Sequence, residues 1–184
     1  MARKLREDFE GAIHHVYARG NDRQAIFLSD LDRRFYLATL RSVVMERGWG
    51  CLAYCLMPNH VHLLIETPRA NLGRGMQVLH GKYAQRFNQR HGRHGHLFQG
   101  RFGAVRVKDD AQLWMAAAYI AGNPVRAGLC ERPEEWRWSS HAAIVNGRAL
   151  FWLDVARLLS FFEIPAAGSR RRYVGLVGAR LKAA

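Results

Sequence analysis

The sequence predicts an α+β fold, and the order of its apolar segments is the main reason. Four stretches have the alternating or continuously apolar pattern of strands, and three longer ones repeat apolar residues every three or four positions, as helices do. The resulting order is strand, helix, strand, strand, helix, strand, helix. This order is typical of an antiparallel sheet with helices packed on one face, in a ferredoxin-like arrangement. With 184 residues, 49% of them hydrophobic, the chain can form one such domain and a C-terminal helical or irregular extension.

The first part of the chain supplies a strand and a helix. We expect residues 1–10 to form a loose arm and Ala12–Arg19 to form a strand. Ser29 or Asp30 is positioned to cap a helix that runs to about Arg47. The apolar residues expected on the buried side of this helix are Leu31, Phe35, Ala38, Leu40, Val43 and Val44.

A hairpin follows within Cys51–Thr67. Two short apolar strands meet there at Pro58-Asn59. Residues on both faces of the first strand are apolar, which predicts a central position in the sheet.

The remaining elements are three helices, a strand and a basic tail. The second helix spans about Leu72–Arg90, and its apolar stripe consists of Leu72, Met76, Leu79, Tyr83 and Phe87. A strand lies within Leu97–Val107, and a third helix begins at Asp109-Asp110 and is expected to break at Asn123-Pro124. After a short helix near Asp154–Phe162, the tail is either a flexible arm or a last helix.

The charge of the chain points to a polyanionic partner. The formal net charge is +13, so nucleic acid is the first expectation and an anionic membrane the second. No acidic residue occurs between Glu66 and Asp109, and none after Glu163. The candidate phosphate-contacting residues in these two stretches are Lys82, Arg86, Arg90, Arg93, Arg101, Arg106, Lys108, Arg170, Arg171 and Arg172. The sequence contains no membrane-length apolar run and no disulfide framework, so we expect a cytoplasmic, nucleoid-associated protein.

His60 and His62 are the candidate metal ligands. They are two residues apart on a predicted strand, so both imidazoles project from the same face. Imidazole pairs bind Zn²⁺, Mn²⁺, Ni²⁺ or Cu²⁺, and bind Mg²⁺ when oxygen ligands are added. A histidine pair with this spacing is also compatible with a purely structural role, and His94-Gly95-His96 repeats the spacing among glycines.

Tyr83 is the candidate nucleophile toward a phosphodiester. It lies in the basic stretch, and Lys82 and Arg86 would favour its phenolate. Because Tyr83 also lies on the apolar stripe of its helix, a core role remains the alternative.

Four segments in order resemble the single-tyrosine histidine–hydrophobe–histidine (HUH) transposases, and in particular the REP-associated tyrosine transposases. They are YCLMPNHVHLLIE at 54–66, GKYAQRFNQRHGRHGHLFQGRF at 81–102, NPVRAGL at 123–129 and WRWSS at 136–140. The resemblance implies a catalytic domain over residues 11–145 and a basic C-terminal extension over 146–184.

The resemblance also implies a chemistry. His60 and His62 would hold Mg²⁺ or Mn²⁺, and Tyr83 would attack single-stranded DNA to give a 5′-phosphotyrosine and a free 3′-OH. The substrates would be imperfect hairpins with flanking guide nucleotides, processed by a monomer or a homodimer. Related enzymes place a Gln four residues after the tyrosine as a third ligand, whereas this position is Phe87 here, so Asn88 and His80 are the candidates.

Two other functions remain open at this point. A non-catalytic, domesticated nucleic-acid-binding protein on the same fold would keep the basic residues and need none of the site residues. A nuclease that uses a metal-bound water would not need Tyr83.

Overall fold

One antiparallel sheet organises the molecule. Its four strands are β1 (Ala12–Arg19), β2 (Gly50–Met57), β3 (His60–Thr67) and β4 (Gly103–Val107), in the order β2-β3-β1-β4. The computed structural model describes residues 9–148, 150–162 and 166–183, so most of the predicted N-terminal arm lies outside the described residues. Together with the helices between the strands, this order gives the ferredoxin-like topology and confirms the predicted α+β class.

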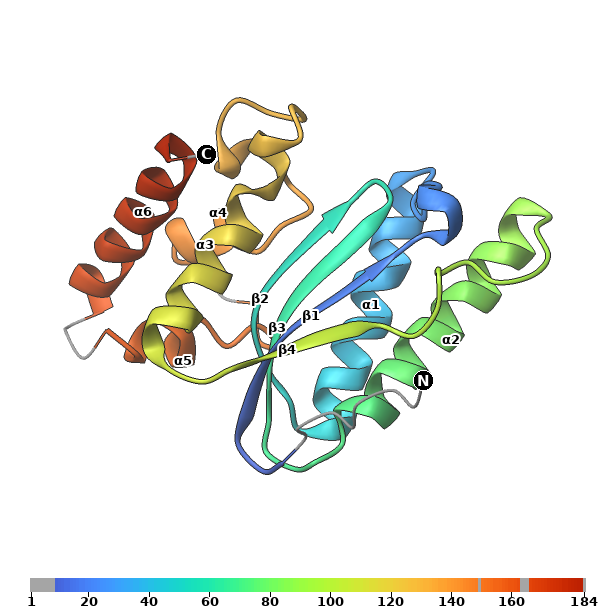
Figure 1. Ribbon diagram of the computed structural model, residues 1–184, viewed down its shortest axis with the longest axis horizontal. Helices are drawn as coiled ribbons and strands as arrows, with labels where there is room; N and C mark the ends of the chain where they lie inside the picture. The colour runs from blue at the N-terminus through green and yellow to red at the C-terminus, as the bar shows by residue number, and fades with distance from the viewer. Residues whose placement is uncertain (1–8, 149, 163–165, 184) are drawn as a thin grey trace.

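Helices cover both faces of the sheet (Figure 1). On one face lie α1 (Asp30–Arg47) and α2 (Leu72–His91), whose apolar side chains pack with Val61 and Leu63 of β3. On the other lie α3 (Asp110–Arg126), α5 (Val155–Ser160) and α6 (Ala166–Lys182), in the same cluster as Leu64 of β3. The expectation that helices cover only one face is therefore corrected. The short elements η1 (Asn21–Arg23), η2 (Pro133–Glu135) and α4 (His141–Val145) complete the fold.

β2 is an edge strand, although its apolar sequence predicted a central one. Its free edge is covered by the chain that follows α3, because the backbone N–H of Leu56 donates to the carbonyl of Trp138 (2.9 Å). In the same way, the N–H of Asp154 donates to the carbonyl of Cys51 (2.7 Å). This pairing covers the edge of β2, while the helices on either side of the sheet bury its two faces, which explains why the strand is apolar throughout.

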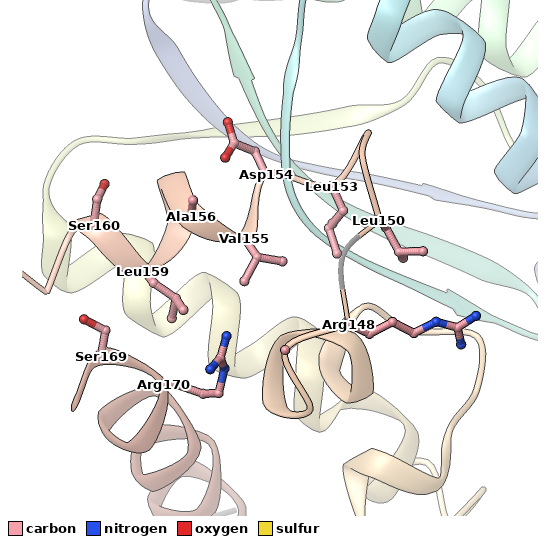
Figure 2. Close-up of a pocket in the computed structure, with 11 residues that line it drawn as sticks. Arg148, Leu150, Leu153, Asp154, Val155, Ala156, Leu159, Ser160, Ser169 and Arg170 are labelled. Carbon is pink, nitrogen blue, oxygen red and sulfur yellow. The ribbon is translucent and has the colours of Figure 1, made fainter. Parts of the chain in front are cut away.

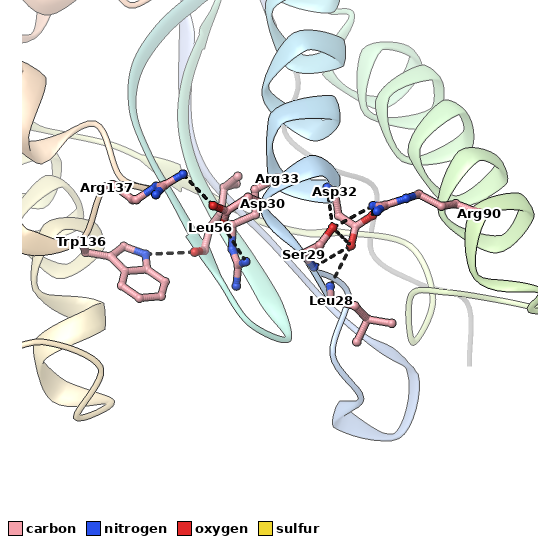
Figure 3. Close-up of polar contacts among 9 residues, drawn as sticks. All are labelled: Leu28, Ser29, Asp30, Asp32, Arg33, Leu56, Arg90, Trp136 and Arg137. Carbon is pink, nitrogen blue, oxygen red and sulfur yellow. Dashed lines mark hydrogen bonds and ion pairs between the residues drawn. The ribbon is translucent and has the colours of Figure 1, made fainter.

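The N-terminus of α1 is built around Asp32. Ser29 caps the helix, and the Asp32 carboxylate accepts hydrogen bonds from the backbone N–H groups of Leu28 and Ser29 (2.9 Å each). Arg90 of α2 also donates to it (2.6 Å), as Figure 3 shows. Asp32 thus takes an inward position, while Leu31, which the sequence placed in the buried stripe, is 58% exposed.

α3 continues through Asn123-Pro124, where the sequence predicted a break. Proline removes one backbone donor, but it stands near the end of the helix, which closes at Arg126. Here the side chains of Asn123 (2.9 Å) and Arg126 (2.6 Å) donate to the carbonyl of Tyr119.

The C-terminal tail forms a helix, which decides between the two alternatives left by the sequence. α6 packs on α3 and buries Tyr173 and Val177. None of the helices within the described ranges is both long and apolar enough to cross a membrane.

Candidate active site

His60 and His62 share the face of the sheet that α3 covers. Both belong to β3, with Val61 pointing to the opposite face between them. Their ring centres are 5.0 Å apart and the ring planes are nearly perpendicular, at 87°. His62 is buried and His60 is partly exposed, and both line a cavity of about 400 Å³. The prediction that the two imidazoles project from the same face of the sheet is therefore confirmed.

Asn59 determines the protonated nitrogen of His60. The Asn59 amide nitrogen donates to the carbonyl of Arg23 (3.0 Å), so its oxygen faces His60 Nδ1 at 2.7 Å. Because that oxygen can only accept, Nδ1 of His60 carries the proton in the neutral ring. The Nε2 lone pair is then available for a metal ion.

His62 has a comparable partner in His15 of β1. The Nε2 of His15 lies 3.0 Å from Nδ1 of His62, and the two ring centres are 5.1 Å apart. If Nδ1 of His62 donates, its Nε2 is unprotonated, as in metal-binding histidines whose other nitrogen is hydrogen-bonded. His15 was not among the predicted site residues, although the alternation of β1 next to β3 places it on this face.

Burial keeps these imidazoles neutral at physiological pH. It lowers the pKa of His15 to about 4, and, with the positive charge of Arg19, it lowers the pKa of His60 to about 4. Burial and the neighbouring histidines and arginines lower the pKa of His62 to about 2. Neutral imidazole is the form that binds a metal ion.

Tyr83 lies on the opposite face of the sheet from this pair. It is only 1% exposed, and its hydroxyl donates to the carbonyl of Ile26. Its ring packs among aromatic rings of the α1 and α2 face: Phe27, Phe35, Tyr36, Phe87 and Phe98. Burial raises the pKa of its phenol far above the ordinary value. The structure therefore does not bring Tyr83 to His60 and His62, as a nucleophile acting with them would require, and the alternative of a core residue describes its position.

The two candidate third ligands lie on α2 as well. His80 is buried, stacks on Phe98 with ring centres 4.2 Å apart, and has Nε2 3.3 Å from the Tyr36 hydroxyl. The Asn88 side chain donates to the carbonyl of Gly95 (2.9 Å). Neither is brought to the histidine pair.

Tyr119 of α3 is the tyrosine that faces the pair from the covering helix. Its ring stands edge-on to His62, with centres 5.4 Å apart, and its centre lies 5.7 Å from that of His15. The guanidinium of Arg126 lies over the Tyr119 ring, 4.6 Å from its centre. The sequence reasoning missed Tyr119, yet the signal was present: the amide side chain of Asn123 follows it by four residues, the spacing sought after Tyr83.

The cavity beside the histidine pair is positively charged. Arg19 and Arg101 contribute to its lining together with Tyr17 and Gly103. Residues Gln99, Gly100 and Arg101 also line a larger groove of about 870 Å³ against α2. Of the predicted phosphate-contacting residues, Arg101 is therefore the one that the structure brings into this cavity.

The other predicted basic residues are distributed over the molecule. Arg90 pairs with Asp32, Arg93 donates to Gln24 (3.0 Å), and Arg86 lies near the Phe35 ring. Lys82, Lys108, Arg171 and Arg172 are exposed, and Arg106 lies over the Phe9 ring. Arg170 donates to the carbonyl of Ile144 (2.7 Å) and lines a separate cavity of about 510 Å³ between α5 and α6 (Figure 2).

A metal ion at this site would need ligands beyond histidine. Across the described ranges, no group of three or more His, Cys, Asp or Glu side chains is arranged to hold one. Two neutral imidazoles completed by amide, water or phosphate oxygens form a donor set that suits Mn²⁺ or Mg²⁺.

Comparisons with known proteins agree with this fold. The family model described as "Transposase IS200 like" matches residues 9–123, which is more than half of the chain and includes His60, His62 and Tyr119. A Haemophilus influenzae protein assigned to the REP-associated tyrosine transposases is 26% identical over 147 residues, covering 73% of this chain and 83% of that protein. A solved REP-associated tyrosine transposase, bound to a REP hairpin, superposes with a TM-score of 0.68 and 18% identity, over 82% of this chain and 89% of that one. The chain belongs to the IS200-like transposase family.

Proposed function

We propose that this protein nicks and rejoins single-stranded DNA at REP-like hairpins through a 5′-phosphotyrosine intermediate on Tyr119. The observation that carries the proposal is the convergence of His60, His62 and Tyr119 on one face of the sheet, beside a cavity lined with arginine. The hairpin substrate is extended to this chain from the REP-associated transposase that shares its fold and was bound to a REP hairpin.

His60 and His62 would hold a divalent cation, Mg²⁺ or Mn²⁺, through their Nε2 atoms. When bound, the cation would supply positive charge beside the scissile phosphate, where negative charge grows in the transition state. Asn59 and His15 orient the two rings through their Nδ1 atoms. Asn123, one turn after Tyr119, is the candidate third ligand in place of Asn88 and His80.

Tyr119 would supply the nucleophile. Its phenol loses a proton, its oxygen forms a bond to phosphorus, and the bond from phosphorus to the 3′ oxygen breaks. That oxygen takes up a proton and leaves as a 3′-OH. The positive charge of Arg126 against the ring compensates the charge of the phenolate. Because the phosphodiester energy is kept in the tyrosine ester, the reverse reaction with another 3′-OH rejoins the strand without a nucleotide cofactor.

Arg19 and Arg101 would hold the phosphates that flank the scissile one. Both line the cavity that contains the histidine pair, where guanidinium groups can pair with phosphate oxygens.

The experiment is an adduct assay with two tyrosine variants. The protein is incubated with a labelled single-stranded REP-type hairpin and Mg²⁺ or Mn²⁺, and the covalent protein–DNA adduct is resolved under denaturing conditions. We expect Tyr119→Phe to abolish the adduct while DNA binding is retained. Tyr83→Phe is the matched control and should still form it.

Other results would favour the alternative functions. Cleavage that survives Tyr119→Phe without any adduct would indicate a nuclease that uses water. Binding without cleavage in either metal would indicate a domesticated, non-catalytic DNA-binding protein.

A further inference from the structure

Tyr17 is an exposed aromatic residue on an inner strand of the sheet. It lies in β1, which pairs with β3 on one side and β4 on the other, yet 44% of its surface is exposed. Inner-strand aromatics are normally covered by the core. The Tyr17 ring instead lines the cavity that contains His60 and His62.

Gly103 allows the ring to lie flat over the neighbouring strand. Tyr17 is paired with Gly103 across β1 and β4, and with His62 across β1 and β3. A β-carbon on Gly103 would stand 2.3 Å from Cζ and 2.7 Å from Oη of Tyr17. The hydroxyl of Tyr17 thus lies over β4, on the side away from β3. This placement makes Tyr17 a poorer nucleophile candidate than Tyr119, whose ring stands edge-on to His62.

The surroundings of the ring fit one nucleotide. The cavity measures about 400 Å³, within the range of small-ligand sites, and Arg19 and Arg101 stand in it with the histidines. The centre of the Tyr17 ring is 6.5 Å from that of His62. A base stacked on Tyr17 would therefore belong to a nucleotide adjacent to a phosphate held at His62.

We propose that Tyr17 is the stacking platform for the base next to the scissile phosphate, with Gly103 keeping that platform flat. The inference rests on the proposed function, because that function places the DNA strand and its scissile phosphate at the histidine pair. Stacking of a base on an aromatic ring depends on the π-face and tolerates any base, so the contact would hold the strand in place without reading its sequence.

The test is a binding measurement that does not depend on cleavage. Anisotropy of a fluorescein-labelled oligo(dT) strand is followed in EDTA with Tyr17→Ala, Tyr17→Phe and Tyr17→Trp. We expect Tyr17→Ala to weaken binding by about 5- to 100-fold, and Tyr17→Phe and Tyr17→Trp to bind like the unchanged protein. Phe151→Ala is the control, because Phe151 is 75% exposed and does not line this cavity.

A second comparison separates stacking from a structural role of the ring. The difference between the unchanged protein and Tyr17→Ala should shrink on a strand whose bases are replaced by abasic sites. Gly103→Ala should weaken binding when Tyr17 is present and add nothing to Tyr17→Ala. Equal binding of Tyr17→Ala and the unchanged protein would overturn the proposal, as would a loss in Tyr17→Phe as large as in Tyr17→Ala.

The two proposals fail in distinguishable ways. If Tyr119→Phe still forms the adduct and Tyr17→Phe does not, Tyr17 is the nucleophile and both assignments are overturned. If no adduct forms under any condition while the Tyr17 effect on binding persists, the proposed strand transfer fails and the platform stands.

Discussion

Tyr83 and His62 lie on opposite faces of the same sheet. The backbone of β3 separates them, with Val61 and Leu63 packed toward α2 and His62 directed toward α3. A movement that joined them would have to open the aromatic cluster around Tyr83 and cross the sheet. The proposed chemistry therefore assigns Tyr83 to the core and Tyr119 to the reaction.

Tyr83→Phe tests that assignment through stability. The hydroxyl of Tyr83 donates to the buried carbonyl of Ile26, and removing the donor leaves that carbonyl unpaired. We expect the free energy of unfolding to fall by about 1–3 kcal/mol, measured by urea denaturation, with cleavage at saturating DNA unchanged. A variant of full stability that had lost cleavage would contradict the core role.

Asp32→Asn should weaken the polar contacts between α1 and α2. The carboxylate is capped by backbone donors and paired with Arg90 and His91, so its loss should cost about 1–3 kcal/mol of unfolding free energy. Asp30→Asn, an exposed neighbour on the same turn, is the matched control and should change stability by less than about 1 kcal/mol.

The cost of Asp32→Asn should depend on pH in one direction. Burial alone would raise the pKa of Asp32, but hydrogen bonds from His91, Leu28, Ser29 and Arg90 hold it below its ordinary value. The unfolded chain therefore takes up this proton first, and the stabilisation is present above the ordinary carboxyl pKa and lost as the pH falls below it. Denaturation curves for the two proteins should converge in acid, and a difference that grew in acid would show the sign to be wrong.

His80 should make the protein sensitive to mild acid. Burial lowers its pKa to about 3, whereas the unfolded chain binds this proton near pH 6.5. Stability should fall as the pH drops from 6.5 toward 4, with a slope of up to about 1.4 kcal/mol per pH unit from this group. His80→Gln should reduce the slope. An unchanged slope between pH 6.5 and 4 would mean that His80 is not buried in neutral form.

Mn²⁺ binding should depend on both histidines of β3. Because each supplies one nitrogen, we expect His60→Ala or His62→Ala to weaken Mn²⁺ affinity at least about 10-fold, measured by isothermal titration. His94→Ala, on an exposed loop, should bind Mn²⁺ as the unchanged protein does. Equal affinities across the three variants would remove the metal site from the proposal.

Local sequence pattern predicted much of the scaffold. The bounds of β1 and β3 and the cap at Ser29 follow from alternation and capping chemistry, and the alternation also brought His60 and His62 together. Because β1 and β2 run in the same direction, as do β3 and β4, the right-handed crossover rule places α1 and α2 on one face.

The face occupied by α3 could not be predicted in that way. No strand follows α3, so α3 is not part of a strand–helix–strand crossover and the crossover rule does not determine its face. Its apolar pattern fits either face of the sheet. The stripe of α2 did indicate that Tyr83 was buried. The local pattern did not show that α3, α5 and α6 form a second helical layer on the other face of the sheet. It therefore did not show that Tyr119 of α3 lies beside His62.

The packing of α6 on α3 has a consequence for C-terminal truncation of the chain. α6 approaches α3 closely enough that a β-carbon on Gly122 would stand 3.1 Å from Leu181, and Tyr173 and Val177 fill the space between them. The family segment ends inside α3, so the helix that carries Tyr119 depends on residues beyond that segment for its outer cover. Trimming the tail would loosen the packing around Tyr119, the proposed nucleophile, in addition to removing positive charge. Natural variants with shorter tails would need other apolar residues to cover α3 in its place.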